Sequence, residues 1–153
     1  MSLDISLHVP ATIYCERCGH VQGVSPGAEE PCYSANITHN LNDMASAAGL
    51  YEALWHPEML VAPRGDDAQI RELEAQGQLL EALALQVKLP RPKARDLIEY
   101  LRAGLVLLRA DPAKYRALAP ANGWGTYETL VHVAAEYLSA CETTPDAFVE
   151  VSR

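Results

Sequence analysis

Residues 32–40 read CYSANITHN, and a change of pattern inside this stretch decides the fold class. Apolar and polar residues alternate as far as Ile37, which predicts a strand with one apolar face. Apolar residues then recur at helical spacing as far as Ala48, and either Thr38 or Asn40 can cap the first turn. The chain is therefore expected to pass from a strand directly into a helix.

Two further strands are predicted near the ends of the chain. Leu3–Val9 alternates, with Pro10 expected to end the strand, and Ala147–Val151 alternates again. The residues between favour helices, including one over Asp66–Val87 with Gly77 packed against another backbone. The sequence thus predicts one α+β domain over residues 1–153, in which a small, mainly antiparallel sheet of N-terminal, middle and C-terminal strands packs against about four to five helices.

Composition and charge narrow the classes of function. The 153 residues are 49% hydrophobic with a net charge of -8. No apolar run is long enough to span a bilayer, and no secretory signal opens the sequence, so a cytoplasmic protein without membrane attachment is expected. The negative charge disfavours non-specific binding to nucleic acid.

The basic residues concentrate in the segment Lys88–Arg116. The simplest interpretation is a solvated helix face, because helices commonly carry such charges. The alternative is a surface for an anion or for an acidic protein partner, which would make the protein an interaction module.

Three cysteines lie in the segment 15–32, which we interpret as a zinc-knuckle-like insertion. Cys15-x-x-Cys18 followed by glycine suits two thiolates that bind one ion in a tight turn. Cys32 and either His20 or His39 would complete a structural zinc site, across an exposed loop over residues 21–31. Thiols without metal and a redox pair remain alternatives.

The polar segment Asn36–Asn40 lies where the strand becomes a helix, a common position for ligand-binding groups. Helix capping by Thr38 or Asn40 also explains these residue types. His39 and Asp43 are four residues apart, so they could form a general-base dyad of a hydrolase. No nucleophile motif, phosphate loop or HExxH motif supports an enzyme, and a binding protein is favoured.

A second polar segment, Asn122–Tyr127, reads NGWGTY. Trp124 between two glycines either plugs the core, the commoner use of an aromatic residue, or presents a ring for stacking. We hypothesise a small cytoplasmic accessory or binding protein with a small anionic or nucleotide-like ligand between the two segments. The candidate ligand-binding residues are Asn36, Thr38, His39, Asn40, Asn122, Trp124 and Tyr127.

The two motifs, together with Met44 in the intervening helix and a valine-rich C-terminal strand, resemble a family of small uncharacterised bacterial and phage proteins. The resemblance covers most of the chain. It implies a cytoplasmic single domain with the two polar motifs as its signature, and it implies no particular activity. The cysteine-rich segment is less typical of that pattern, so a zinc site would be peculiar to this member.

Overall fold

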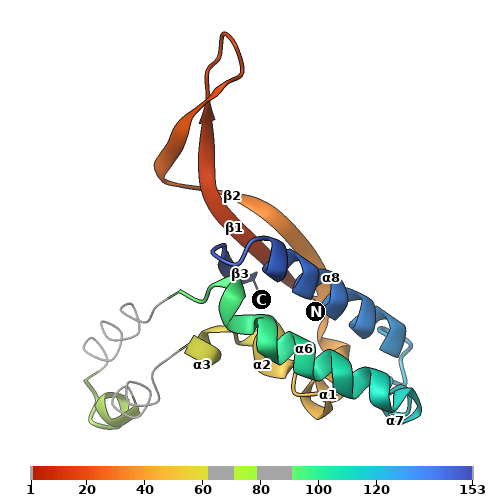
Figure 1. Ribbon diagram of the computed structural model, residues 1–153. Coiled ribbons are helices and arrows are strands. Elements are labelled where there is room, and N and C mark those ends of the chain that lie inside the picture. The colour runs from red at the N-terminus through yellow and green to blue at the C-terminus, as the bar shows by residue number, and fades with distance from the viewer. Residues whose placement is uncertain (1, 62–70, 79–90, 153) are drawn as a thin grey trace.

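The computed structural model describes residues 2–61, 71–78 and 91–152 and has the expected α+β fold. Three strands form one antiparallel sheet in the order β2-β1-β3. They are the predicted N-terminal, middle and C-terminal strands, with β1 at Ser2–Tyr14, β2 at Val21–Thr38 and β3 at Phe148–Ser152 (Figure 1).

Alternation along β1 places one face of the sheet in the core. Leu3, Ile5 and Leu7 are completely buried, whereas Asp4 between them is exposed. Ile5 pairs with Ala35 of β2 on one side and with Val151 of β3 on the other. The period of two predicted from the sequence therefore sets which face the helices cover.

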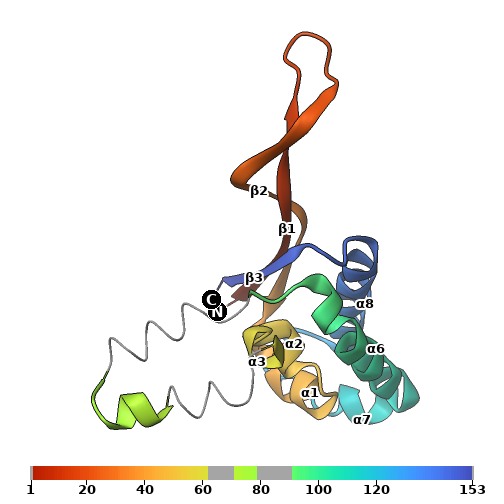
Figure 2. The ribbon, with the colours of Figure 1, turned by 60° about the vertical axis from the view of Figure 1, so that its left-hand side comes forward.

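The helices lie together on that apolar face (Figures 1 and 2). α6 and α8 pack against each other, and α8 also contacts β2. None of the helices in the described ranges is long and apolar enough to cross a membrane. The helices that lie wholly within residues 2–61 and 91–152 are η1 (His39–Leu41), α1 (Asn42–Ala47), α2 (Tyr51–Trp55), α3 (Glu58–Val61), α6 (Ala94–Ala110), α7 (Pro112–Arg116) and α8 (Tyr127–Thr143).

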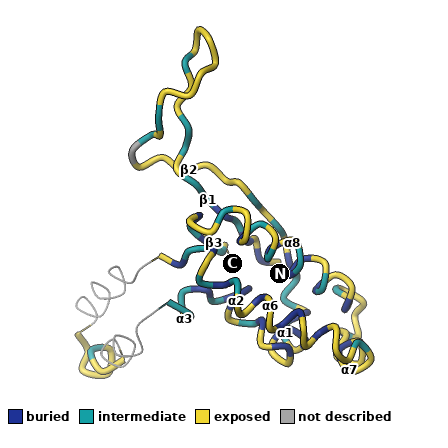
Figure 3. Tube along the Cα trace, in the orientation of Figure 1, coloured by how far each residue is buried: buried dark blue, intermediate teal, exposed yellow. Residues whose placement is uncertain are grey.

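The sheet continues beyond the core as a two-stranded arm, formed by Pro10–Tyr14 of β1 and Val21–Glu29 of β2. In Figure 1 it projects away from the helices, and Figure 3 shows almost all of it exposed or half-buried. The expected loop over residues 21–31 is therefore wrong, and Pro10 does not end β1. Irregularities in the pairing on both sides of Pro10 let the ribbon accommodate a residue without an N–H.

The predicted helix Asp66–Val87 falls mostly outside the described residues. Within it, Gly77 has φ +75°, and a Cβ there would meet no atom within 4 Å. The N–H groups of Gly77 and Gln78 donate to the carbonyls of Glu74 and Leu73, as at a helix C-terminus. Gly77 thus ends a helical turn, and no backbone of the described residues packs closely against it as the sequence led us to expect.

Candidate functional site

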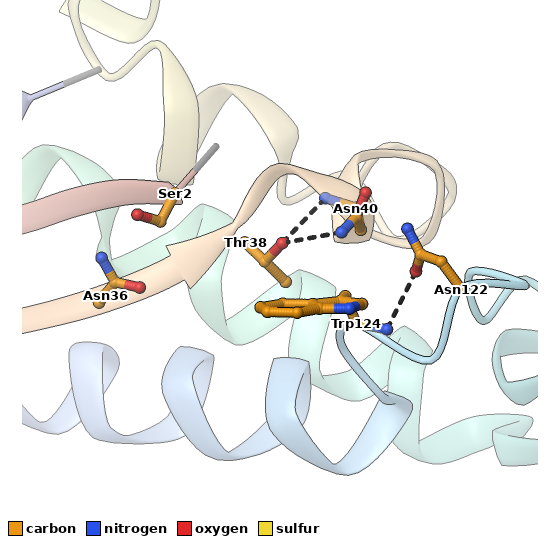
Figure 4. A pocket seen from close by; sticks show the side chains of 6 residues that line it. All are labelled: Ser2, Asn36, Thr38, Asn40, Asn122 and Trp124. Atoms are coloured by element: carbon orange, nitrogen blue, oxygen red, sulfur yellow. Dashed lines mark hydrogen bonds between the residues drawn. The ribbon is translucent and has the colours of Figure 1, made fainter.

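The two polar segments meet around one open pocket of about 620 Å³. The cavity lies where β1 begins and β2 ends, and the loop before α8 forms its other side (Figure 4). This volume is in the range of small-molecule sites. We call it the Asn–Trp pocket, and its lining residues are Ser2, Asn36, Thr38, Asn40, Asn122 and Trp124.

Gly125 is the reason that the two segments can touch. A Cβ at this position would lie 2.9 Å from Thr38 Cγ2 and 2.9 Å from Leu41 Cγ. Its φ of +102° is also a conformation that residues with side chains rarely adopt. The loop therefore rests directly on the junction between β2 and η1, with its backbone closer than any other residue would allow.

Thr38 confirms the predicted helix cap and also lines the pocket. Its hydroxyl accepts from the backbone N–H of Asn40 at 3.3 Å and from the Asn40 side-chain amide at 3.2 Å. Asn36 donates its side-chain N–H to Asp4 Oδ1 across the strand pair at 2.6 Å. These bonds fix the orientation of both amides, so the polar wall of the pocket is held before any ligand arrives.

Trp124 is exposed to solvent, and the interpretation that its side chain fills the core is wrong. Its side chain is 72% exposed, the largest exposure among the exposed large apolar side chains of the described residues. Asn122 Oδ1 accepts the backbone N–H of Trp124 at 3.0 Å, which shapes the turn. Figure 4 shows the indole beneath Thr38, with Asn36 on one side of it and Asn122 on the other.

Two residues of the predicted ligand-binding set lie elsewhere. His39 Nδ1 accepts the indole N–H of Trp55 at 3.2 Å, and no hydrogen bond joins His39 to the exposed Asp43, although both are described. Tyr127 is 8% exposed, and its hydroxyl donates to Leu108 O at 3.1 Å. The geometry of the described residues therefore gives neither a His39–Asp43 dyad nor an aromatic wall at Tyr127.

Ser2 lines the pocket, although its own surroundings in the sequence gave no sign of this. It pairs with Thr38 in the register of β1 and β2. Ser2 could have been found only by considering both strands together. Pairing the apolar residues of β1 with those of β2 places the start of β1 opposite the end of β2.

The predicted zinc ligands are not brought together. Cys15 and Cys18 lie at the tip of the arm, whereas Cys32 lies at its base and donates its thiol to Leu7 O at 3.4 Å. Along β1 the distance from Leu7, beside Cys32, to Tyr14, beside the tip, is seven residues at about 3.3 Å each, so roughly 20 Å separates Cys32 from the tip. Among the described residues no group of three or more His, Cys, Asp or Glu side chains is placed to hold a metal ion.

The four cysteines, which are all free, differ in chemical character. A hydrogen bond from Cys18, and further bonds from the backbone at Arg17 and Cys18, lower the pKa of the Cys15 thiol. Burial raises the pKa of the Cys141 thiol to about 12. Thiolate chemistry is therefore favoured at the tip of the arm and disfavoured in the core.

The basic segment is largely neutralised within the chain. Arg91 makes a two-pronged pair with Glu29 at 2.8 and 3.1 Å, and its guanidinium lies 4.5 Å from the centre of the Phe148 ring. Arg102 pairs with Glu142 at 2.7 Å. Lys93 and Arg95 pair with Asp146, and Arg116 pairs with Glu128. This matching favours a structural use of the charges over a surface reserved for an acidic partner.

No family model, curated protein or solved structure matches the chain. The fold and the site together define an α+β protein with an open pocket of amides, hydroxyls and one exposed indole.

Proposed function

We propose that the protein is a small cytoplasmic binding protein, and that the Asn–Trp pocket takes a nucleoside or mononucleotide. One observation carries the proposal. An indole that is 72% exposed is placed beside amide and hydroxyl side chains from a segment more than eighty residues earlier in the chain.

The indole supplies a stacking surface for a flat ring. Stacking of a base on an aromatic side chain contributes about 1–3 kcal/mol. Exposing an indole to water is unfavourable, and the ordered turn at Asn122 holds Trp124 in that position without a ligand. A ring that covered the indole would recover that cost.

The amides supply recognition of the edge of the ring. Each asparagine side chain offers two donors and one acceptor oxygen, which matches the mixed donors and acceptors of a nucleobase. Asn36 and Asn40 each use part of that capacity on Asp4 and Thr38, which fixes their planes and leaves the remaining groups for a ligand. A fixed amide loses less conformational entropy on binding than a mobile one.

The uncharged lining favours recognition of the base and sugar of a nucleotide over recognition of its phosphate. Among the described residues that line the pocket, none is Lys or Arg. Recognition therefore falls on the base and sugar, and a phosphate would extend into solvent. The net charge of -8 also disfavours a polyanionic strand as the ligand.

The test is titration with the four ribonucleosides and their 5′-monophosphates, followed by tryptophan fluorescence and by calorimetry. Trp55 is 1% exposed and gives a constant background, so quenching would report Trp124. We expect saturable binding of at least one nucleoside, with similar affinity for its monophosphate. If no nucleoside changes the fluorescence or produces heat at millimolar concentration, the proposal fails.

Variants of the lining give the residue-level test. Trp124→Ala should abolish binding measured by calorimetry, and Asn36→Ala should weaken it up to about tenfold, the effect of one neutral hydrogen bond. Tyr100→Ala is the matched control, because Tyr100 is also an exposed aromatic residue but does not line this pocket. Equal loss in Tyr100→Ala would show that the heat does not come from the Asn–Trp pocket.

A further inference from the structure

The turn at the tip of the arm, residues 15–20, is closed by two backbone hydrogen bonds and contains the Cys15-x-x-Cys18 pair. The N–H of Cys15 donates to His20 O, and the N–H of Gly19 donates to Cys15 O, both at 2.8 Å. Gly19 has φ +71°, which a residue with a side chain would adopt only under strain. These two backbone bonds close the turn around the Cys15-x-x-Cys18 pair, which places both cysteines at the end of the arm.

This pair is half of a ligand set. A structural zinc ion takes four protein ligands in a tetrahedron, with zinc–sulfur distances of about 2.3 Å. The other cysteines of the chain, Cys32 and Cys141, lie at the base of the arm and in the core. The arm is described throughout, and it contains no third His, Cys, Asp or Glu placed with the pair around a common point.

The surface beside the tip is apolar and uncovered. Tyr14 pairs with Val21 next to the turn, and these side chains are 58% and 64% exposed. Ile13, which pairs with Gly23, and Val24, which pairs with Thr12, follow along the arm and are also exposed. An isolated two-stranded ribbon is marginally stable in water, and none of the described residues covers the apolar side chains at the end of this one, so a contact with another molecule would stabilise it.

We propose that two copies of the protein join tip to tip through one zinc ion, which is bound by Cys15 and Cys18 of each copy. A two-fold axis through the ion gives identical environments to both pairs and covers Tyr14 and Val21 of each arm with those of the other. Each of the four thiols releases its proton to solvent when the metal binds. Four thiolates leave no open coordination position, so the zinc links the copies and performs no chemistry.

In this arrangement the arm serves dimerisation and does not take part in binding at the Asn–Trp pocket. The arm holds the tip away from the helices (Figures 1 and 2), so joining two tips leaves both pockets accessible. The result would be a bivalent molecule with one ligand site at each end.

The test measures metal content and mass of the full chain, purified without added metal and kept with a non-thiol reductant. We expect one zinc ion for two chains by elemental analysis and a dimer by sedimentation velocity. A chelator should give monomers, and zinc chloride should restore the dimer. A zinc-loaded monomer, or a chain that neither takes up zinc nor dimerises when zinc is added, would overturn the proposal.

Single substitutions identify the ligands. Cys15→Ser and Cys18→Ser should each lose the zinc and the dimer, while far-ultraviolet circular dichroism stays unchanged because neither residue is in the core. Cys32→Ser is the matched control, a loss of an exposed thiol away from the tip, and should keep both. His20→Ala should also keep both, and loss of zinc in either control would contradict a site made of the two tip pairs.

Discussion

The two buried tyrosines of α8, Tyr127 and Tyr137, differ in whether the hydroxyl makes a hydrogen bond. Tyr127 donates its hydroxyl to Leu108 O, whereas the hydroxyl of Tyr137 finds no partner among the described residues. Tyr137 stacks on Tyr33 with ring centres 5.6 Å apart, so its ring packs well even though its hydroxyl is unpaired. Burial raises the pKa of Tyr33 to about 12 and raises the pKa of Tyr137 well above its ordinary value, which keeps both hydroxyls protonated.

This contrast predicts different effects of the same substitution. Tyr127→Phe should lower the free energy of unfolding by about 1 kcal/mol, because a hydrogen bond is lost and Leu108 O is left without its donor. Tyr137→Phe should leave it unchanged or raise it, because it removes a buried polar group that has no partner. Urea unfolding of both variants checks the prediction, and an equal loss in the two would contradict it.

Gly125 gives a second prediction at this scale. Gly125→Ala should destabilise the protein and weaken ligand binding, because the added methyl overlaps Thr38 and Leu41 and forces the loop away from the pocket. Gly123→Ala is the matched control, since Gly123 has φ +72° but open space around its Cβ. We expect the control substitution to lower the free energy of unfolding by about 1–2 kcal/mol, because of the backbone conformation alone. Gly125→Ala should cost about 1–3 kcal/mol more in urea unfolding, and equal losses would mean that the close approach is not required.

Local chemistry explains which residues of the site were predictable. Thr38 as a cap and the polar character of Asn36 and Asn40 follow from hydrogen bonding within a few residues. The exposure of Trp124 does not, because it depends on what the loop packs against. His39 was misplaced for the same reason, since its partner Trp55 belongs to a later helix.

At the scale of elements, one ion pair joins the base of the arm to the body. Glu29 of β2 pairs with Arg91, whose guanidinium also stacks on Phe148 at the start of β3. The hydrogen bond from Arg91 lowers the pKa of Glu29 below its ordinary value. The pair therefore contributes full stability above the pKa of the unfolded chain, about 4.3, and the contribution disappears as the pH falls through the lower pKa of the folded state.

Glu29→Gln should accordingly reduce the sensitivity of stability to acid. At pH 7 it should lower the free energy of unfolding by about 0.2–1 kcal/mol, the range of a partly exposed pair, and this effect should shrink as the pH falls below about 4.3. Glu30→Gln is the control, because the Glu30 carboxylate accepts only a backbone N–H, that of Thr12, among the bonds of the described residues. Urea midpoints from pH 7 to pH 3 measure the difference, and parallel curves for wild type and Glu29→Gln would contradict the prediction.

The strands and helices of the body were predictable because each is amphipathic over its own length. The arm was not, because residues 21–29 carry the Pro and Gly residues and the paired glutamates that indicate a loop. What makes them a strand is a partner, residues 10–14, with which they pair in spite of several irregularities. Such pairing depends on tertiary structure, and the β-propensities of single residues do not predict it.

At the scale of the whole molecule, the arm and the body divide the protein into parts with different sources of stability. The core is one cluster drawn from both ends of the chain, with Leu3, Ile5 and Leu7 at one end and Val149 at the other. None of its residues lies between 10 and 32. The Asn–Trp pocket belongs to the body, and the cysteine tip belongs to the arm.

The arm should therefore be removable. Replacing residues 11–28 with Asn-Gly between Pro10 and Glu29, which face each other in the strand pair, closes the sheet with a tight turn and keeps the Glu29–Arg91 pair. With a chelator present, so that metal links neither protein, the free energy of unfolding should stay within about 1 kcal/mol of the full chain, because the arm buries no core residue. Nucleoside binding should be retained, and zinc uptake and dimerisation should be lost.

The control for removal of the arm is Ile5→Ala, a substitution in the part of β1 that belongs to the body. Ile5 is completely buried, so its truncation should cost about 2–5 kcal/mol by the same measurement. A large loss on removing the arm, together with loss of nucleoside binding, would show that the arm supports the fold rather than extending from it. Retained binding with lost dimerisation would instead mean that the two activities proposed for this chain reside in separable parts of one sheet.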